Sequence, residues 1–248
     1  AFVTELGRNP HAGRPFQDDN AAIARALEDA SVPALLCSLV HMTGDPSWIR
    51  GSRRPRSGGP TLLQGGMPAE EQAAVRREAL SVIAAYRDAG CRPHAPSREL
   101  LLEMMDFLAC RSLPPRQVEL FFFDLQFDGA DGAAITWGDE IDAGVKADSP
   151  VIVIGAGMAG IHAGIRLTQA GLPFTIVEKN AGPGGTWWEN RYPGARVDVA
   201  SHQYCYSFEP ADHWSEYYCQ QPELRGYFTR VLDKYGLRPR CRFETEVT

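Results

Sequence analysis

The chain has 248 residues, and its hydrophobic content of 44% is enough for the buried core of one large domain or two ordinary domains. The formal net charge of −6 argues against general affinity for polyanions, so neither nucleic acid nor an acidic membrane surface is an expected partner. The six cysteines form no C-x-x-C pair and no signal peptide is recognisable, so we expect a cytoplasmic protein with reduced thiols. No apolar stretch approaches the roughly 18 residues that cross a bilayer, so we expect no transmembrane segment.

The first half of the chain has helical periodicity. Apolar residues recur at three- and four-residue steps from Asp18 onward, and four later segments have the lengths and end signals of helices. The pattern therefore predicts an all-α N-terminal domain whose apolar faces form either an internal core or a subunit contact. The expected helical segments after the first are 33–42, 68–88, a segment from Ser97 through Leu108, and 114–127.

Two stretches of the first half lack periodicity. The basic segment 50–59 is rich in loop-forming residues and is interpreted as a solvated loop, with a phosphate-binding patch as the alternative. The segment 128–150 is rich in Gly, Ala and Asp and is interpreted as a connector. We therefore expect a helical domain with its connector over residues 1–148 and a second domain over 149–248.

The pattern changes at Val151 to strand, glycine turn, helix and strand. The apolar run 151–154 precedes the turn 155–160, a helix follows over 161–170, and a second strand follows over 174–177. This order is a βαβ unit and predicts an α/β, Rossmann-like domain with a parallel sheet. The alternating residues 242–248 predict one more strand of that sheet.

The glycine turn suits a dinucleotide because a pyrophosphate needs bare backbone N–H groups and the positive end of a helix dipole. Gly155 permits the tight turn, Gly157 lets the backbone approach the phosphates, and Gly160 lets the helix pack closely against the strand. A tight turn without a ligand is the alternative interpretation of the same spacing. The position after a buried strand and before a helix favours the binding site.

The residues that follow the glycine turn limit which dinucleotide can bind. Glu178, at the end of the second strand, can accept hydrogen bonds from both ribose hydroxyls and would repel a 2′-phosphate, which favours FAD or NAD(H). The alternative is an exposed acid that pairs with Lys179. A second glycine pair, 184–185, and the flat rings of Trp187 and Trp188 favour FAD over NAD(H).

Three segments in this region resemble the Baeyer–Villiger monooxygenases. They are Gly-Gly-Thr-Trp at 184–187, Asn-Arg-Tyr-Pro-Gly-Ala-Arg-Val-Asp at 190–198, and Tyr-Cys-Tyr-Ser-Phe at 204–208. The resemblance implies an enzyme that uses FAD and NADPH to insert one oxygen atom from O₂ next to a ketone carbonyl, which gives an ester or lactone.

Two segments of the helical half, 32–36 and 41–45, resemble the N-terminal helical extension of the 4-hydroxyacetophenone monooxygenase subfamily. That resemblance implies an aryl or bulky ketone as the substrate. It also implies a homodimer formed through the extension.

The resemblance also assigns roles to residues of this chain. Asp198 corresponds to a catalytic acid at the reacting face of the flavin, where it hydrogen-bonds a mobile arginine. Arg196 to Asp198 correspond to contacts with NADPH. The alternative interpretation of these residues is a structural salt bridge between Arg196 and Asp198. The implied cofactor-binding residues are Gly155, Gly157, Gly160, Glu178, Gly185, Thr186, Trp187, Trp188, Glu189, Arg196, Val197, Asp198, Tyr204 and, on the expected strand 243–247, Val247.

Parts of the family pattern are missing from this sequence. The signature F-x-G-x-x-x-H-x-x-x-W, a second glycine motif and the active-site arginine are absent, so we expect the chain to be the N-terminal portion of a longer enzyme. The histidines show no metal-ligand spacing and no serine lies in a G-x-S-x-G elbow, so a metal site is not expected. The alternatives are an N-oxygenating flavin monooxygenase and a non-catalytic FAD-binding or assembly module.

Overall fold

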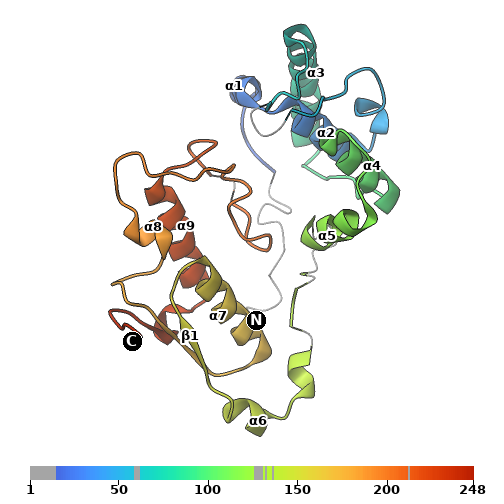
Figure 1. Ribbon diagram of the computed structural model, residues 1–248. Coiled ribbons are helices and arrows are strands. Elements are labelled where there is room, and N and C mark those ends of the chain that lie inside the picture. Colours follow the sequence, from blue (N-terminus) through green and yellow to red (C-terminus); the bar gives the residue numbers. More distant parts are fainter. Residues whose placement is uncertain (1–14, 59–61, 126–130, 132, 136, 212) are drawn as a thin grey trace. The chain divides into compact units, whose positions relative to one another are not determined.

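The computed structural model describes residues 15–58, 62–125, 131, 133–135, 137–211 and 213–248. Contacts within the chain divide it after Phe127 into two compact units, which we call the helical unit and the α/β unit (Figure 1). The sequence pattern placed this division near Asp148 instead. None of the helices in the described ranges is long and apolar enough to cross a membrane.

The helical unit has the helices that the periodicity predicts. Helix α2 (Val32–Thr43) is the most apolar of them, and Leu36 and Leu39 on it are fully buried, as are Val75 and Ala79 on α3 (Ala69–Asp88). Ser97 caps α4 (Arg98–Ala109) as expected, because its hydroxyl accepts a hydrogen bond from the Leu100 N–H (3.2 Å). The helices are α1 (Asn20–Asp29), α2 (Val32–Thr43), η2 (Pro46–Trp48), α3 (Ala69–Asp88), α4 (Arg98–Ala109) and α5 (Pro115–Leu125).

Two arginines of the basic loop pair with acids on neighbouring helices. Arg50 makes a two-pronged ion pair with Glu103 on α4, with Nε–Oε1 and Nη2–Oε2 distances of 2.8 Å. Arg53 pairs with Glu78 on α3 (Nη2–Oε1 2.6 Å). These partly exposed pairs fasten the loop to the helical unit, which favours the structural interpretation over a phosphate-binding patch.

The α/β unit contains the βαβ order that the sequence predicts. Strands β1 (Val151–Ile154), β2 (Phe174–Val177) and β3 (Cys241–Arg242) form a parallel sheet in that order, and α7 (Met158–Ala170) connects the first two (Figure 1). Helix α9 (Gln221–Lys234) buries Leu224 and Phe228 in the same core as Ile161 and Ile176. The remaining short helices are α8 (Thr186–Glu189) and η4 (Arg238–Arg240).

The face of β1 that points away from the core is exposed to solvent. Ile152 and Ile154 are 69% and 70% exposed, while Val151 and Val153 pack against the core. Parallel sheets are normally covered on both faces, which is why such strands are apolar at every position. The strand therefore has the composition of a doubly covered strand, but the described residues of this chain cover only one of its faces.

The connector packs with the α/β unit. It contains two short helices, η3 (Trp137–Glu140) and α6 (Ala143–Ala147). Asp131, whose side chain is only 3% exposed, forms an ion pair with Arg166 on α7. This pair attaches the connector to the helix of the βαβ unit, so the α/β unit begins before the residue at which the sequence placed its start.

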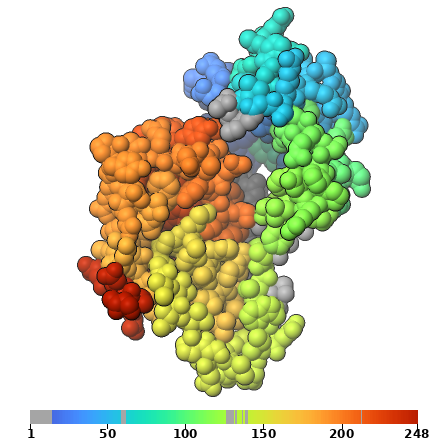
Figure 2. Space-filling view, viewed as in Figure 1, coloured from blue at the N-terminus to red at the C-terminus, as the bar shows by residue number. Residues whose placement is uncertain are grey.

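The expected strand over 242–248 is wrong in extent. Pairing of β3 with β2 ends at Arg242, and Glu244 has a positive φ of 53°. The chain then turns across the end of β2, where the Thr245 N–H donates to the Glu178 carbonyl oxygen (2.9 Å). These last residues lie at the surface (dark red in Figure 2).

Candidate functional site

The glycine turn between β1 and α7 is built as its spacing predicts. Gly155 has a φ of 94°, which side chains rarely tolerate, and Gly157 is the N-cap residue of α7 with extended backbone. A Cβ on Gly160 would overlap the carbonyl oxygen of Gly155. No side chain in the described ranges caps α7, so its first N–H groups and the positive end of its dipole can receive an acceptor from a ligand.

Gly160 provides a test of this packing that does not involve a ligand. Replacing Gly160 with alanine is expected to destabilise the α/β unit by about 3 kcal/mol, because the added methyl group meets backbone that cannot move aside. Urea denaturation of the variant would measure the loss. The matched control is Gly226→Ala on α9, where the Cβ meets only the flexible end of Arg230 at 3.4 Å and stability should change by about 1 kcal/mol at most.

A second pair of glycines closes onto the first turn. Gly184 and Gly185 both have positive φ values, 133° and 52°, and the Gly184 N–H donates to the Ala156 carbonyl oxygen (3.0 Å). A Cβ on Gly185 would lie 3.0 Å from the Cα of Gly157. The two glycine segments therefore meet backbone to backbone and leave bare peptide groups on both sides of one groove.

Glu178 is buried beside this turn, with 4% of its surface exposed. Its Oε2 accepts from the Ala156 N–H (2.7 Å), and its Oε1 accepts from the backbone N–H and the side-chain amide of Asn180 (both 2.8 Å). The predicted alternative, an exposed Glu178 paired with Lys179, is not formed. The carboxylate instead joins the end of β2 to the glycine turn.

Lys179 pairs with a different acid. Its ammonium group lies 2.9 Å from Oε1 of Glu189 on α8, and the Asn180 amide donates to the same oxygen (3.2 Å). These two donors lower the pKa of Glu189, and the same ion pair raises the pKa of Lys179. Because the pair is exposed to solvent, it contributes little to stability.

A groove of about 290 Å³ runs along these residues. It is bordered by the glycine turn, the end of β2, the start of α8 and the C-terminal segment. Seven of the residues singled out from the sequence line it together: Gly155, Gly157, Glu178, Gly185, Thr186, Glu189 and Val247.

The predicted aromatic residues lie away from the groove. Trp187 is buried, and its indole N–H donates to the Tyr204 hydroxyl (3.2 Å), with the two rings edge to face. Trp188 is stacked by the guanidinium groups of Arg191 and Arg225, which lie 4.8 and 4.1 Å from its ring centre. In this arrangement both tryptophans pack the unit and neither presents a flat face to the groove.

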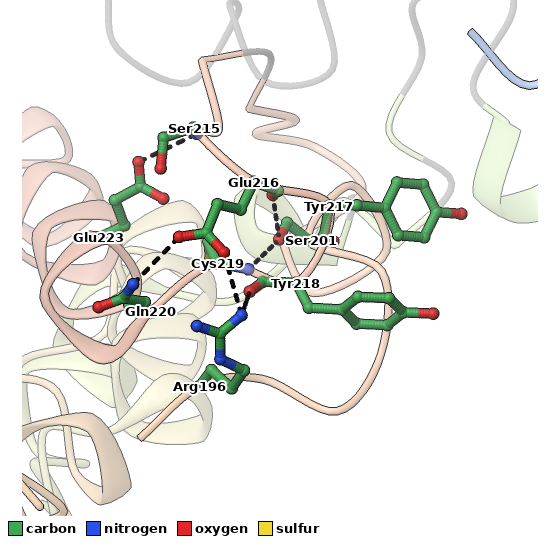
Figure 3. Close-up of polar contacts among 9 residues, drawn as sticks. All are labelled: Arg196, Ser201, Ser215, Glu216, Tyr217, Tyr218, Cys219, Gln220 and Glu223. Carbon is green, nitrogen blue, oxygen red and sulfur yellow. Dashed lines mark hydrogen bonds and ion pairs between the residues drawn. The ribbon is translucent and has the colours of Figure 1, made fainter. Parts of the chain in front are cut away.

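Arg196 and Asp198 do not pair with each other. Arg196 instead donates to Glu216 (3.0 Å) and to the Tyr218 carbonyl oxygen (3.4 Å), as Figure 3 shows. Asp198 is exposed and makes no hydrogen bond or ion pair within the part of the chain that the structure describes. The alternative of a structural Arg196–Asp198 bridge is therefore wrong.

The segment around Asp198 is held on both sides. Val197 is buried and its N–H donates to the Cys219 carbonyl oxygen (3.1 Å). Ser201 is fully buried, accepts from the Cys219 N–H (2.9 Å) and donates to the Tyr217 carbonyl oxygen (3.0 Å; Figure 3). Asp198 is therefore an exposed carboxylate on a short, anchored stretch of backbone.

Sequence reasoning missed several residues of the groove. Asn180, Thr245 and Glu246 line it beside Glu178. Asn180 could have been noticed as an Asx residue two positions after the acid, since such side chains often bond to neighbouring polar groups. Thr245 and Glu246 could not have been noticed in the sequence, because the turn at Glu244 that directs them to the groove lies within a segment that alternates like a strand.

Comparison with known proteins relates the chain to flavin-dependent enzymes. Residues 153–220 match the model of an NAD(P)-binding Rossmann-like domain. An uncharacterized monooxygenase of Sinorhizobium fredii is 33% identical over 227 residues, which are 90% of this chain and 33% of the relative. That match is longer than the α/β unit and so extends into the helical unit.

Relatives with assigned names match a shorter part of the chain. A Baeyer–Villiger monooxygenase of Streptomyces coelicolor is 43% identical over 98 residues, 39% of this chain and 19% of the relative. A solved structure of an oxidised steroid monooxygenase bound to NADP is 47% identical and covers 40% of this chain and 20% of its own, with a TM-score of 0.39. The chain spans between about a fifth and a third of the length of these relatives.

These relationships agree with the glycine turn, the acidic residue at the end of β2 and the Gly-Gly-Thr-Trp segment, all of which lie in the matched region. The homologues of this chain are Baeyer–Villiger and related FAD-binding monooxygenases.

Proposed function

We propose that this chain forms the FAD-binding part of an NADPH-dependent Baeyer–Villiger monooxygenase, which inserts one oxygen atom from O₂ next to a ketone carbonyl to give an ester or lactone. One observation carries the proposal. Bare glycine backbone, an uncapped helix N-terminus and a buried carboxylate border the same groove. Names of relatives that include Baeyer–Villiger monooxygenases support the reaction type.

The groove has the chemistry that the adenosine diphosphate half of FAD requires. Gly155, Gly157 and Gly185 would let the pyrophosphate approach the first N–H groups of α7, where the helix dipole favours negative charge. Glu178 would accept a ribose hydroxyl. A volume of about 290 Å³ lies at the low end for small-molecule sites, which suits the nucleotide portion rather than the whole cofactor.

The charges of the groove favour FAD over NADPH at this position. Glu178, Glu189 and Glu246 face it, with Lys179 as the nearby cation. A 2′-phosphate placed among these carboxylates would be repelled, so NADPH would bind elsewhere in the full-length protein. When bound, FAD would supply the redox chemistry, because it can take hydride from NADPH and react with O₂.

We assign the remaining predicted residues to the flavin and NADPH side of the site. Arg196, Val197 and Asp198 would meet NADPH, and Asp198 would act as the catalytic acid by hydrogen-bonding an arginine from beyond this chain. Its exposure and its free carboxylate support that role. Trp187 and Tyr204 would support the flavin region from the core, through their mutual hydrogen bond.

The proposals for the substrate class and the assembly state are based on the resemblance of segments 32–36 and 41–45 to the helical extension of the 4-hydroxyacetophenone monooxygenase subfamily. We propose an aryl or bulky ketone as the substrate and a homodimer formed through the helical unit. Apolar side chains on α4 and α5, among them Leu108, Leu120 and Phe123, are 48–56% exposed and support such a contact. The mass of the holoenzyme in solution would distinguish a dimer from a monomer.

Reconstitution of the full-length protein tests the function. The purified protein should bind FAD in a one-to-one ratio and, with NADPH and O₂, convert an aryl ketone to an ester that carries one labelled atom from ¹⁸O₂. A protein that stays colourless with FAD would overturn the flavin site. An N-oxide formed from an amine, with no ester from any ketone, would favour the N-oxygenating alternative, and bound FAD without oxygenation would favour the non-catalytic module.

A further inference from the structure

We propose that Asn180 is the positioning residue that holds Glu178 in the orientation needed to bind the adenosine ribose. The inference rests on the proposed FAD site and adds to it a residue for which neither the glycine motif nor the Gly-Gly-Thr-Trp segment assigns a role. It is based on three contacts of Asn180, each made to a different part of the groove.

The first contact is with the carboxylate itself. A carboxylate has about four acceptor positions, and Glu178 uses three of them within the chain. Two are filled at Oε1 by the backbone N–H and the side-chain amide of Asn180, both at 2.8 Å, and one at Oε2 by Ala156 (2.7 Å). The open position is therefore on Oε2, and its direction depends on how Asn180 holds Oε1.

The second contact holds the asparagine amide. The same nitrogen, Nδ2, donates to Oε1 of Glu189 at 3.2 Å, so its two hydrogens bridge two carboxylates. An amide nitrogen has two hydrogens, and here each has an acceptor. This bridge restricts rotation of the Asn180 side chain and, with it, rotation of the Glu178 carboxylate.

The third contact holds the backbone. The carbonyl oxygen of Asn180 accepts from the Glu244 N–H (3.1 Å), next to the bond between Thr245 and Glu178. Asn180 therefore connects the end of β2 with α8 and with the C-terminal segment, and all three border the groove. A residue that fixes all three borders should affect ligand geometry more than overall stability, since part of its surface is open to solvent.

Replacement of Asn180 has two distinguishable effects. Alanine removes the amide but keeps the backbone N–H, so Glu178 loses one of three hydrogen bonds and can rotate. Aspartate adds a negative charge between Glu178 and Glu189, which should push the carboxylates apart. A hydrogen bond to a charged group typically changes affinity by about tenfold or more when lost.

The experiment uses the apo form of the full-length protein and calorimetric titration with ADP, 2′-deoxy-ADP and FAD. In the unmodified protein ADP should bind about tenfold more tightly than 2′-deoxy-ADP, because Glu178 accepts the ribose hydroxyl. Asn180→Ala should reduce this ratio to about two and weaken FAD binding about tenfold, and Asn180→Asp should weaken FAD further. Asn20→Ala, an asparagine in the helical unit that pairs with Arg87, is the matched control and should leave the ratio unchanged.

The outcomes separate this inference from the proposed function. If the unmodified protein binds neither FAD nor ADP, the FAD site itself is wrong. If it binds both but the ratio of ADP to 2′-deoxy-ADP affinity is the same in Asn180→Ala, then Asn180 does not position Glu178. Equal loss of affinity for both nucleotides, with the ratio kept, would show a purely structural role and would also overturn the inference.

Discussion

Replacing Gly157 with valine is expected to remove FAD binding while the α/β unit stays folded. Gly157 has an extended backbone that valine adopts readily, and a Cβ there would meet backbone atoms of Gly185 at ordinary contact distances, the Cα at 3.5 Å and the nitrogen at 3.8 Å. The side chain would nevertheless occupy the groove and keep the pyrophosphate from the first N–H groups of α7. The loss of about two charge-assisted hydrogen bonds corresponds to about a hundredfold weaker binding.

Titration of the apoprotein with FAD, followed by flavin fluorescence, measures this effect, and thermal unfolding checks the fold. Gly51→Val is the matched control, because its Cβ would meet nothing within 4 Å and it lies in the helical unit. FAD affinity within threefold of the unmodified protein would show that the pyrophosphate does not lie at this turn. The two glycine variants should differ, because Gly160→Ala should lower the stability of the α/β unit, whereas Gly157→Val should lower FAD affinity without unfolding it.

Replacing Asp198 with alanine is expected to slow NADPH-dependent oxygenation about a hundredfold while FAD remains bound. The carboxylate is exposed, has no partner in the described ranges of the chain, and lies on backbone anchored by Val197 and Ser201. Removing it should therefore leave the local structure intact and remove only an acceptor for a group that the rest of the protein supplies. Steady-state turnover and the flavin absorbance spectrum measure the two properties separately.

Two further variants sharpen this test. Asp198→Asn keeps a hydrogen-bond acceptor but loses the charge, so an intermediate rate would indicate that charge matters. Asp233→Ala removes another exposed carboxylate, one that pairs with Arg238 on the surface, and its turnover should be unchanged. Unchanged turnover in Asp198→Ala would reject the catalytic role of this residue.

Local patterns predicted the βαβ unit well. The strands Val151–Ile154 and Phe174–Val177 were placed correctly, because each is encoded by neighbouring residues with a simple period. The helices of the N-terminal half were predicted for the same reason. The helix between the two strands begins at Met158 rather than at the expected residue 161, so the last three residues of the expected turn belong to the helix. The exposed face of β1 could not be predicted, since an apolar strand pattern does not say which faces the rest of the chain covers.

The error at the C-terminus has a definite cause. Residues 242–248 alternate as a strand does, but pairing with β2 ends at Arg242 and Glu244 adopts a positive φ. The backbone groups that a longer strand would have offered to β2 bond instead to Glu178 and Asn180. Alternation of apolar and polar residues shows that a segment can form a strand, but the length of the strand depends on how far a neighbouring strand pairs with it.

The sequence by itself determined the glycine turn, the helix that follows it and the acid at the end of β2, because these depend on residues close together in the chain. Only the tertiary structure decided what that acid contacts. Lys179, its neighbour, pairs with Glu189, while Glu178 is buried against Ala156, 22 positions away. Burial and hydrogen-bond partners are set by segments that meet through folding, and the spacing of residues along the chain does not specify those meetings.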